Sequence, residues 1–169
     1  MGVLFYFAIS ISSSSQNGKE PVKVTDMLKI KTISSVTLNN DGSKAVFTVT
    51  GIEPDEANKW EYKYVTQLWM TNTDNSSTPR QLTFAKEGAS QPAWKPDGTQ
   101  IAFVRTIEGK PQLFLLSFEG GEPLQLTRYK YGATSPRWSK DGKQLLFVSG
   151  IPLKELLTDP AVRRRLLQS

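Results

Sequence analysis

Short apolar segments recur along the chain, and polar turn residues separate them. Near the middle, Ile101 and Phe103 alternate with Ala102 and Val104, which predicts a β-strand with apolar side chains on both faces. The segment that follows, 112–118, is an almost continuous apolar run and suits a strand buried on both faces. In this part of the chain we expect four short strands, one ending at Trp94 and the others at 100–106, 112–118 and 123–127.

These segments belong to an internal repeat. Three stretches align, each with an Asp-Gly pair at the same place and a phenylalanine five residues after the glycine: 35–49, 91–105 and 135–149. A second motif ends at Thr83 and again at Thr127, 44 residues later, and the Asp-Gly pairs at Asp97 and Asp141 have the same spacing. The first pair, at Asp41, precedes the second by 56 residues, so the first unit carries an insertion.

A period in the forties with four short strands per unit is typical of a β-propeller. The predicted fold class is all-β, a partial β-propeller of about two and a half four-stranded antiparallel blades, with short helices near both ends. The predicted blades are 33–84 and 85–128, followed by a partial blade at 129–150. The strands expected in the first and third units are 33–38, 44–50, 62–71, 78–83, 133–138 and 144–149, with the insertion 51–61 as a loop.

The two ends of the chain depart from the repeat. An apolar run at 3–11 is followed by serines, which resembles a secretory signal cut short at its start. We therefore expect a truncated signal peptide at 1–16, with a buried first strand as the alternative interpretation. Residues 17–32 are expected to form a linker with a short helix near 25–30, and 151–169 a helical tail of native or non-native origin.

Composition and charge indicate an ordinary globular domain. Of the 169 residues, 38% are hydrophobic and 22% are charged. The net charge of +5, from 21 basic against 16 acidic residues, is scattered, so no nucleic-acid partner is expected. No apolar run is long enough for a transmembrane helix, so no membrane partner is expected either.

The residue types that are missing restrict the chemistry further. The chain has no histidine and no cysteine, so it cannot assemble a Ser-His-Asp triad, a Cys-His pair or a thiolate metal site. It also lacks a Gly-x-Ser-x-Gly nucleophile elbow and a phosphate-binding glycine loop. We therefore expect no catalytic, cofactor-binding or metal-binding residue within this chain.

Two sets of repeated residues have both a functional and a structural interpretation. Asp41, Asp97 and Asp141 could be metal ligands, but each precedes a glycine in a predicted tight turn, where aspartate accepts hydrogen bonds from backbone N–H groups. Trp94 and Trp138 could be stacking platforms, but their equal places in two repeats favour packing between blades. The structural interpretation is the prediction for both sets.

The insertion contains an acidic cluster. Glu53, Asp55 and Glu56 precede the aromatic residues Trp60 and Tyr62 on the predicted long loop. Loops often carry function, but a cluster of charges on a loop is usually only solvated. No substrate-binding residue is nominated from it.

The repeat resembles a known family. Ser-Pro-Arg-Trp-Ser-Lys-Asp-Gly, which begins at Ser135, resembles the TolB-type propeller repeat, and 120–127 resembles its closing strand. The opening segment 24–30, the inserted first unit and Leu68-Trp69 resemble the amino-terminal propeller of prolyl oligopeptidase family serine peptidases, with acylaminoacyl peptidases and dipeptidyl aminopeptidases as the nearest relatives. The resemblance extends from residue 24 to about residue 157.

The resemblance implies a function for a longer protein. In this family the propeller caps a separate α/β-hydrolase domain that carries the catalytic triad, and it limits the access of large substrates. The expectation is a non-catalytic propeller fragment that gates peptide substrates, and the parent protein is expected to be a serine peptidase. The alternative is a TolB-like periplasmic propeller that binds proteins.

Partners and location follow from the same resemblance. The expected partners are the missing hydrolase domain, the remaining blades and, in the full protein, peptide substrates. The fragment alone is expected to self-associate, because an unclosed propeller leaves strand edges and apolar faces uncovered. An extracytoplasmic location, periplasmic or secreted, is expected. No cofactor is expected.

Overall fold

The computed structural model describes residues 21–58, 60–152 and 154, and its strands form three antiparallel sheets. The first sheet has the order β1 (Thr32–Leu38), β2 (Lys44–Pro54), β3 (Tyr62–Asn72), β4 (Arg80–Gln81). The second has the order β5 (Ser90–Trp94), β6 (Gln100–Ile107), β7 (Lys110–Ser117), β8 (Leu124–Gln125). The third pairs β9 (Thr134–Trp138) with β10 (Leu145–Val148).

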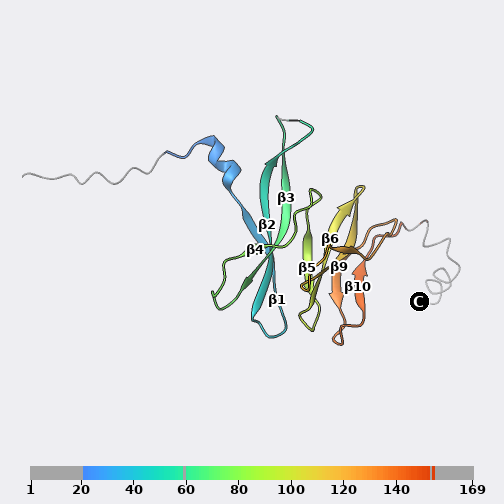
Figure 1. Cartoon of the computed structure of the whole chain (residues 1–169). Helices are drawn as coiled ribbons and strands as arrows, with labels where there is room; N and C mark the ends of the chain where they lie inside the picture. The colour runs from blue at the N-terminus through green and yellow to red at the C-terminus, as the bar shows by residue number, and fades with distance from the viewer. Residues whose placement is uncertain (1–20, 59, 153, 155–169) are drawn as a thin grey trace, which may run out of the picture.

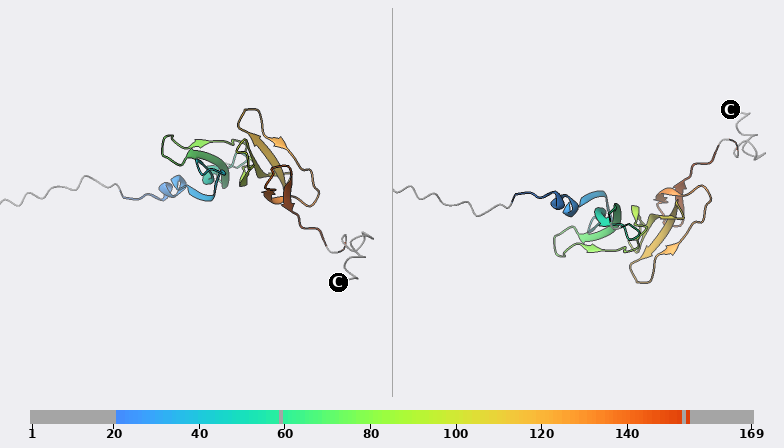
Figure 2. Two further views of the ribbon diagram at one scale, coloured as in Figure 1. Left: turned by 90° about the horizontal axis from the view of Figure 1, so that it is seen from below. Right: turned by 90° about the horizontal axis from the view of Figure 1, so that it is seen from above.

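The sheets stand side by side in a propeller-like arrangement. Within each sheet consecutive strands are neighbours, as in an antiparallel meander. Figure 1 shows the three sheets in chain order, and the end-on views of Figure 2 show them splayed at an angle to one another. The first strand of each sheet lies toward its neighbours, since β5 contacts both β1 and β9. An all-β fold of antiparallel four-stranded sheets was predicted and is confirmed.

The hydrophobic core lies between neighbouring sheets, where the apolar face of one sheet packs against the next. The larger cluster joins Val46 and Leu68 of the first sheet to Ile101, Phe103 and further apolar side chains of the second. On its other face the second sheet packs against the third through Val104, Leu113, Ala133 and Leu145. The second sheet is therefore covered on both faces, which explains the nearly continuous apolar runs in β6 and β7.

The outward faces of the first and third sheets remain open. Val36 of β1 and Leu146 of β10 are each 64% exposed. Leu145 packs under the second sheet, whereas Phe147 is exposed. Adjacent strand residues point to opposite faces, so only one of Leu145 and Leu146 can face the core.

The predicted insertion loop, 51–61, is largely a hairpin extension. Gly51 pairs with Val65 and Pro54 with Tyr62, so β2 and β3 continue in register beyond the repeat. The prediction of a long loop was wrong, since the pairing of β2 with β3 continues through Gly51 to Pro54. Neither prevents pairing here, since Pro54 stands at the very end of the ladder, where proline is tolerated.

The segment before the first sheet forms a short helix of about two turns. A helix was predicted near 25–30, and a 3-10 helix η1 spans Val24–Lys29. Asp26 fixes its start by accepting the Lys23 N–H at 2.8 Å, and it pairs with Lys29 at 2.7 Å. The predicted signal peptide at 1–16 and most of the predicted tail at 151–169 lie outside the described residues.

Candidate functional site

The inner strands β1, β5 and β9 share a distortion at the same repeat position. Each carries a register shift in its pairing with the next strand of its own sheet. Ser35, Gln91 and Ser135 occupy this position with positive φ values of 50°, 52° and 54°. A non-glycine residue in the left-handed region marks a β-bulge that bends the strand and redirects its side chain. The threefold recurrence shows that the bulge belongs to the repeat.

Two tryptophans join the inner strands of neighbouring sheets. Trp94 at the end of β5 donates its Nε1–H to the carbonyl of Thr37 in β1 at 3.2 Å, and Trp138 of β9 donates to the carbonyl of Ala93 in β5 at 3.2 Å. Leu38 takes the equivalent place in the first unit. The packing role predicted for both tryptophans is confirmed for Trp94, which belongs to the core cluster between the first two sheets. Trp138 is half-buried and joins the third sheet to the second through its hydrogen bond, which the repeat did not reveal.

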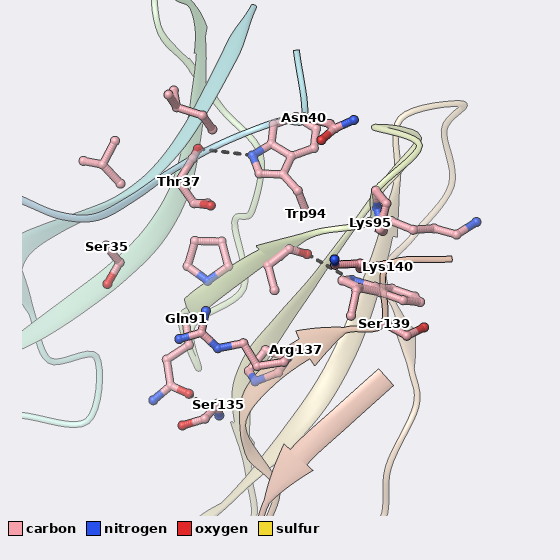
Figure 3. A pocket seen from close by; sticks show the side chains of 17 residues that line it. Ser35, Thr37, Asn40, Gln91, Trp94, Lys95, Ser135, Arg137, Ser139 and Lys140 are labelled. Atoms are coloured by element: carbon pink, nitrogen blue, oxygen red, sulfur yellow. Dashed lines mark hydrogen bonds between the residues drawn. The ribbon is translucent and has the colours of Figure 1, made fainter. Parts of the chain in front are cut away.

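The inner strands border an open cavity of about 890 Å³. Its wall comes from 35–40, 91–96 and 135–140, which contribute the bulges, the tryptophans and the residues that enter the Asp-Gly turns. Figure 3 shows side chains from all three strands directed into this space. In a closed propeller the innermost strands line the central channel, and a cavity in this place would then form one side of it.

The three turn aspartates lie apart, one at the end of each inner strand. In each turn the aspartate Oδ1 accepts the N–H of the residue two positions later: Asp41 from Ser43, Asp97 from Thr99, Asp141 from Lys143. The glycines after them have positive φ, from 66° to 72°. Lys95 at 2.8 Å, with help from Thr99, lowers the pKa of Asp97 to about 2. These carboxylates therefore hold their own turns, as the sequence predicted.

The acidic cluster of the insertion is dispersed. Glu53 belongs to β2 and stands opposite Lys63. Asp55 accepts the Ala57 N–H at 2.8 Å, and Glu56 pairs with Lys86 beyond β4 at 2.5 Å. The hydrogen bond from Lys86 lowers the pKa of Glu56. Each carboxylate has a local partner or faces a lysine, so they form no shared site.

In the second repeated motif, a threonine hydroxyl forms buried hydrogen bonds to a glutamine side chain and to a backbone N–H of the third strand of its sheet. Thr83 Oγ1 donates to Gln67 Oε1 at 2.7 Å and accepts the Leu68 N–H at 2.9 Å. Gln112 and Thr127 repeat this arrangement in the second unit at 2.7 Å. The threonine hydroxyl replaces a backbone carbonyl at the end of the ladder. For this reason β4 and β8 are two residues long, shorter than the strands predicted at 78–83 and 123–127.

Thr83→Val is expected to lower the free energy of unfolding by about 1–3 kcal/mol, because it leaves the buried Leu68 N–H without its acceptor. Valine has nearly the same shape, so packing is conserved. Denaturant midpoints measure the effect. Thr106→Val, at an exposed position of β6, is the matched control and should stay within about 0.5 kcal/mol. Equal midpoints for the two variants would show that the hydrogen bonds of Thr83 do not stabilise the fold.

One repeated pair was missed by sequence reasoning. Gly88-Ala89 and Gly132-Ala133 recur 44 residues apart, just before the second and third inner strands. A Cβ on Gly88 would lie 2.7 Å from the Thr66 carbonyl oxygen, and one on Gly132 would lie 2.8 Å from the Pro111 ring. The available signal was the spacing itself, which equals the period of the repeat.

Among the described residues no helix is both long and apolar enough to span a membrane.

Comparisons with known proteins find sequence relatives and solved structures of similar fold. No family model matches the chain. An uncharacterized peptidase, YuxL, of Bacillus subtilis is 29% identical over 106 residues, which is 62% of this chain and 15% of the relative. Dipeptidyl-peptidase 5 of Porphyromonas endodontalis is 33% identical over 96 residues, 56% of this chain and 13% of the relative. The chain therefore spans only a small part of the length of these peptidases.

Solved structures share the fold. An acylaminoacyl peptidase of Pyrococcus horikoshii superposes with a TM-score of 0.56 at 22% identity, over 73% of this chain and 18% of that one. A TolB-like protein of Agrobacterium tumefaciens superposes with a TM-score of 0.54 at 24% identity, over 72% of this chain and 39% of that one. The predicted resemblance is confirmed: the homologues of this chain are peptidases and its structural neighbours are acylaminoacyl peptidase and a TolB-like propeller, consistent with a propeller of prolyl oligopeptidase family peptidases.

Proposed function

We propose that this chain is a non-catalytic propeller segment of a prolyl oligopeptidase family serine peptidase. In the full protein, further blades would complete the ring, and the propeller would cap a hydrolase domain and gate the entry of peptides. The observation that carries the proposal is the sequence match of these repeats to two peptidases. The chain itself has no histidine and no nucleophile elbow, so the catalytic groups belong elsewhere in such a protein.

The cavity between the inner strands supports the gating role. A propeller hides its strand edges by closing into a ring, and the space left at the centre is a channel of limited width. The wall of that channel in this chain is built mostly from strands and the tight turns that follow them, and indole hydrogen bonds link neighbouring strands. A rigid wall of this kind would admit an extended peptide and exclude a folded protein.

A second candidate function is a TolB-like propeller that binds another protein. It is favoured by the superposition on the TolB-like structure, of which the chain covers the larger share. The likeness shows the fold alone, whereas the sequence relatives are peptidases. We further propose an extracytoplasmic location, on the strength of the apolar run at 3–11.

The test has two steps: the reading frame is sequenced beyond codon 169, and the wall of the channel is then labelled in the longer product. We expect the reading frame beyond codon 169 to encode a Gly-x-Ser-x-Gly elbow and a later histidine. In that longer product, Asn40→Cys places a thiol at the exposed edge of the cavity wall, where a bulky maleimide can be attached. We expect the label to slow hydrolysis of long peptides severalfold relative to small aminoacyl chromogenic substrates, because only long peptides need the full width of the channel.

Glu119→Cys carrying the same label is the matched control, since Glu119 is exposed in the turn between β7 and β8. It should leave the ratio of the two rates unchanged. A frame that encodes only further repeats and then stops would favour the protein-binding alternative. An unchanged ratio after labelling at Asn40 would refute the gating role.

A further inference from the structure

The wall of the inner-strand cavity is basic. Lys95, Arg137 and Lys140 line it, and no carboxylate does. Lys95 is paired with Asp97, whose side chain lies outside the wall, at 2.8 Å. Arg137 and Lys140 form no ion pair within the part of the chain that the structure describes. Two cations are therefore free to attract an anion into this space.

Hydrogen-bond donors gather around one of these cations. Figure 3 shows the side chain of Arg137 extending into the cavity toward Gln91, with Ser135 beside them. Gln91 Oε1 accepts the Ser135 N–H at 2.7 Å, a bond that fixes the orientation of the amide. The amide NH₂ of Gln91 then faces away from this bond as a donor. An arginine fork beside a fixed amide donor is an arrangement that suits a carboxylate, which accepts two parallel hydrogen bonds.

The rest of the wall is mixed: tryptophan, proline and aliphatic side chains present carbon surfaces, and serine, threonine and asparagine side chains lie among them. The indole N–H groups of Trp94 and Trp138 are engaged by carbonyls of the preceding sheets. Pro92 and Pro136 precede them by two residues in the same strands and also line the cavity. Arg137 and Gln91 are exposed to this space, so both can reach a carboxylate that enters it. The site thus combines a cation, amide donors and a surface for the methylene groups of a peptide.

We propose that Arg137, with Gln91 beside it and Lys140 nearby, binds a carboxylate carried by a peptide in the channel. The proposal builds on the proposed gating function, since it names the class of peptide that the wall favours. The carboxylate is supplied either by the carboxyl terminus of the peptide or by an acidic side chain. Both sources present the same pair of oxygens to the guanidinium.

The test is a peptide titration of the full chain, and the fluorescence of the tryptophans that line the cavity reports the binding. Three acetylated alanine-rich peptides are compared: one with a free carboxyl terminus, its carboxyl-terminal amide, and an amidated peptide with one internal glutamate. We expect the free terminus to bind about tenfold more tightly than the amide, because only the ionised group makes charge-assisted hydrogen bonds. Tight binding of the glutamate peptide supports the proposal and identifies a side chain as the source.

Arg137→Gln is expected to weaken binding of the carboxylate peptide about tenfold and to leave the weak binding of the amide unchanged. Arg80→Gln, on the outer strand β4, is the matched control and should change neither. Both positions are exposed, so both variants should keep the wild-type circular dichroism melt. In the wild type the affinity for the carboxylate peptide should also fall as salt is raised.

Equal affinity for all three peptides, or equal affinity of the Arg137→Gln and Arg80→Gln proteins for the carboxylate peptide that the wild type binds most tightly, would overturn the proposal. The measurement involves no hydrolysis. Carboxylate binding can therefore fail while the gating role stands, and it can succeed in a protein whose gene encodes no hydrolase domain.

Discussion

Trp94→Ala is expected to lower the free energy of unfolding by about 3–5 kcal/mol, since it removes a large buried side chain from the junction of the first two sheets. Trp94 is 9% exposed, and its ring centroid lies 5.2 Å from that of Phe118. Its indole also donates to the Thr37 carbonyl at 3.2 Å, which ties β5 to β1. The substitution therefore opens a cavity and leaves a carbonyl without its donor.

Denaturant unfolding measures the loss, and hydrogen exchange locates it. We expect the amides of β1 and β5 to lose protection before those of β7. Trp60→Ala is the matched control, because Trp60 is 91% exposed on the hairpin extension and should change stability by no more than about 0.5 kcal/mol. Similar losses for the two variants would show that the sheets do not depend on this junction. Trp94→Phe separates the contribution of packing from that of the hydrogen bond, since it keeps most of the packing and loses the donor to the Thr37 carbonyl.

Gly88→Ala is expected to cost about 2–4 kcal/mol, the sum of left-handed backbone strain and a steric clash. Gly88 has a φ of +70°, and its Cβ would lie 2.7 Å from the Thr66 carbonyl oxygen. That oxygen already accepts the Ala89 N–H at 2.7 Å. The carbonyl cannot move away from the new methyl group without breaking the bond that holds the start of the second inner strand against β3.

Gly98→Ala supplies the control for the clash. Gly98 has a nearly identical φ of +72°, but a Cβ there would meet nothing within 4 Å. We expect this variant to lose only the strain, about 1–2 kcal/mol. The difference between the two denaturant midpoints then measures the close approach of the backbones. If both variants lose the same stability, the clash with the Thr66 carbonyl does not contribute to the cost of Gly88→Ala.

The repeat predicted the sheets well because its signals are local. An Asp-Gly pair between two apolar segments specifies a tight turn through side-chain hydrogen bonds and a positive φ, and neither depends on distant residues. The β6 and β7 strands were found within a few residues of their observed limits for the same reason. The short strands β4 and β8 were overestimated. Their ends are set by Thr83 and Thr127, whose hydroxyls bond to strands earlier in the chain.

The candidate site was less predictable. Trp94 and Trp138 were placed between blades from their equal repeat positions, and the turn aspartates were assigned to their turns. Arg137 and Gln91 attracted no attention, because they are 46 residues apart and stand at repeat positions where the other two units have different residues. Their proximity depends on how one inner strand sits beside the next, with the bulges at Gln91 and Ser135 directing side chains into the cavity.

By itself, the sequence determined the strands, the turns, the period of the repeat and the absence of a histidine-dependent active site from these 169 residues. Each of these is a property of neighbouring residues or of composition. Only the tertiary structure decided which carbonyls accept the indole N–H groups, why Gly88 must lack a side chain, and which face of β10 is buried. These features arise where separate sheets meet, and the angle and register of that contact come from packing between residues far apart in the chain.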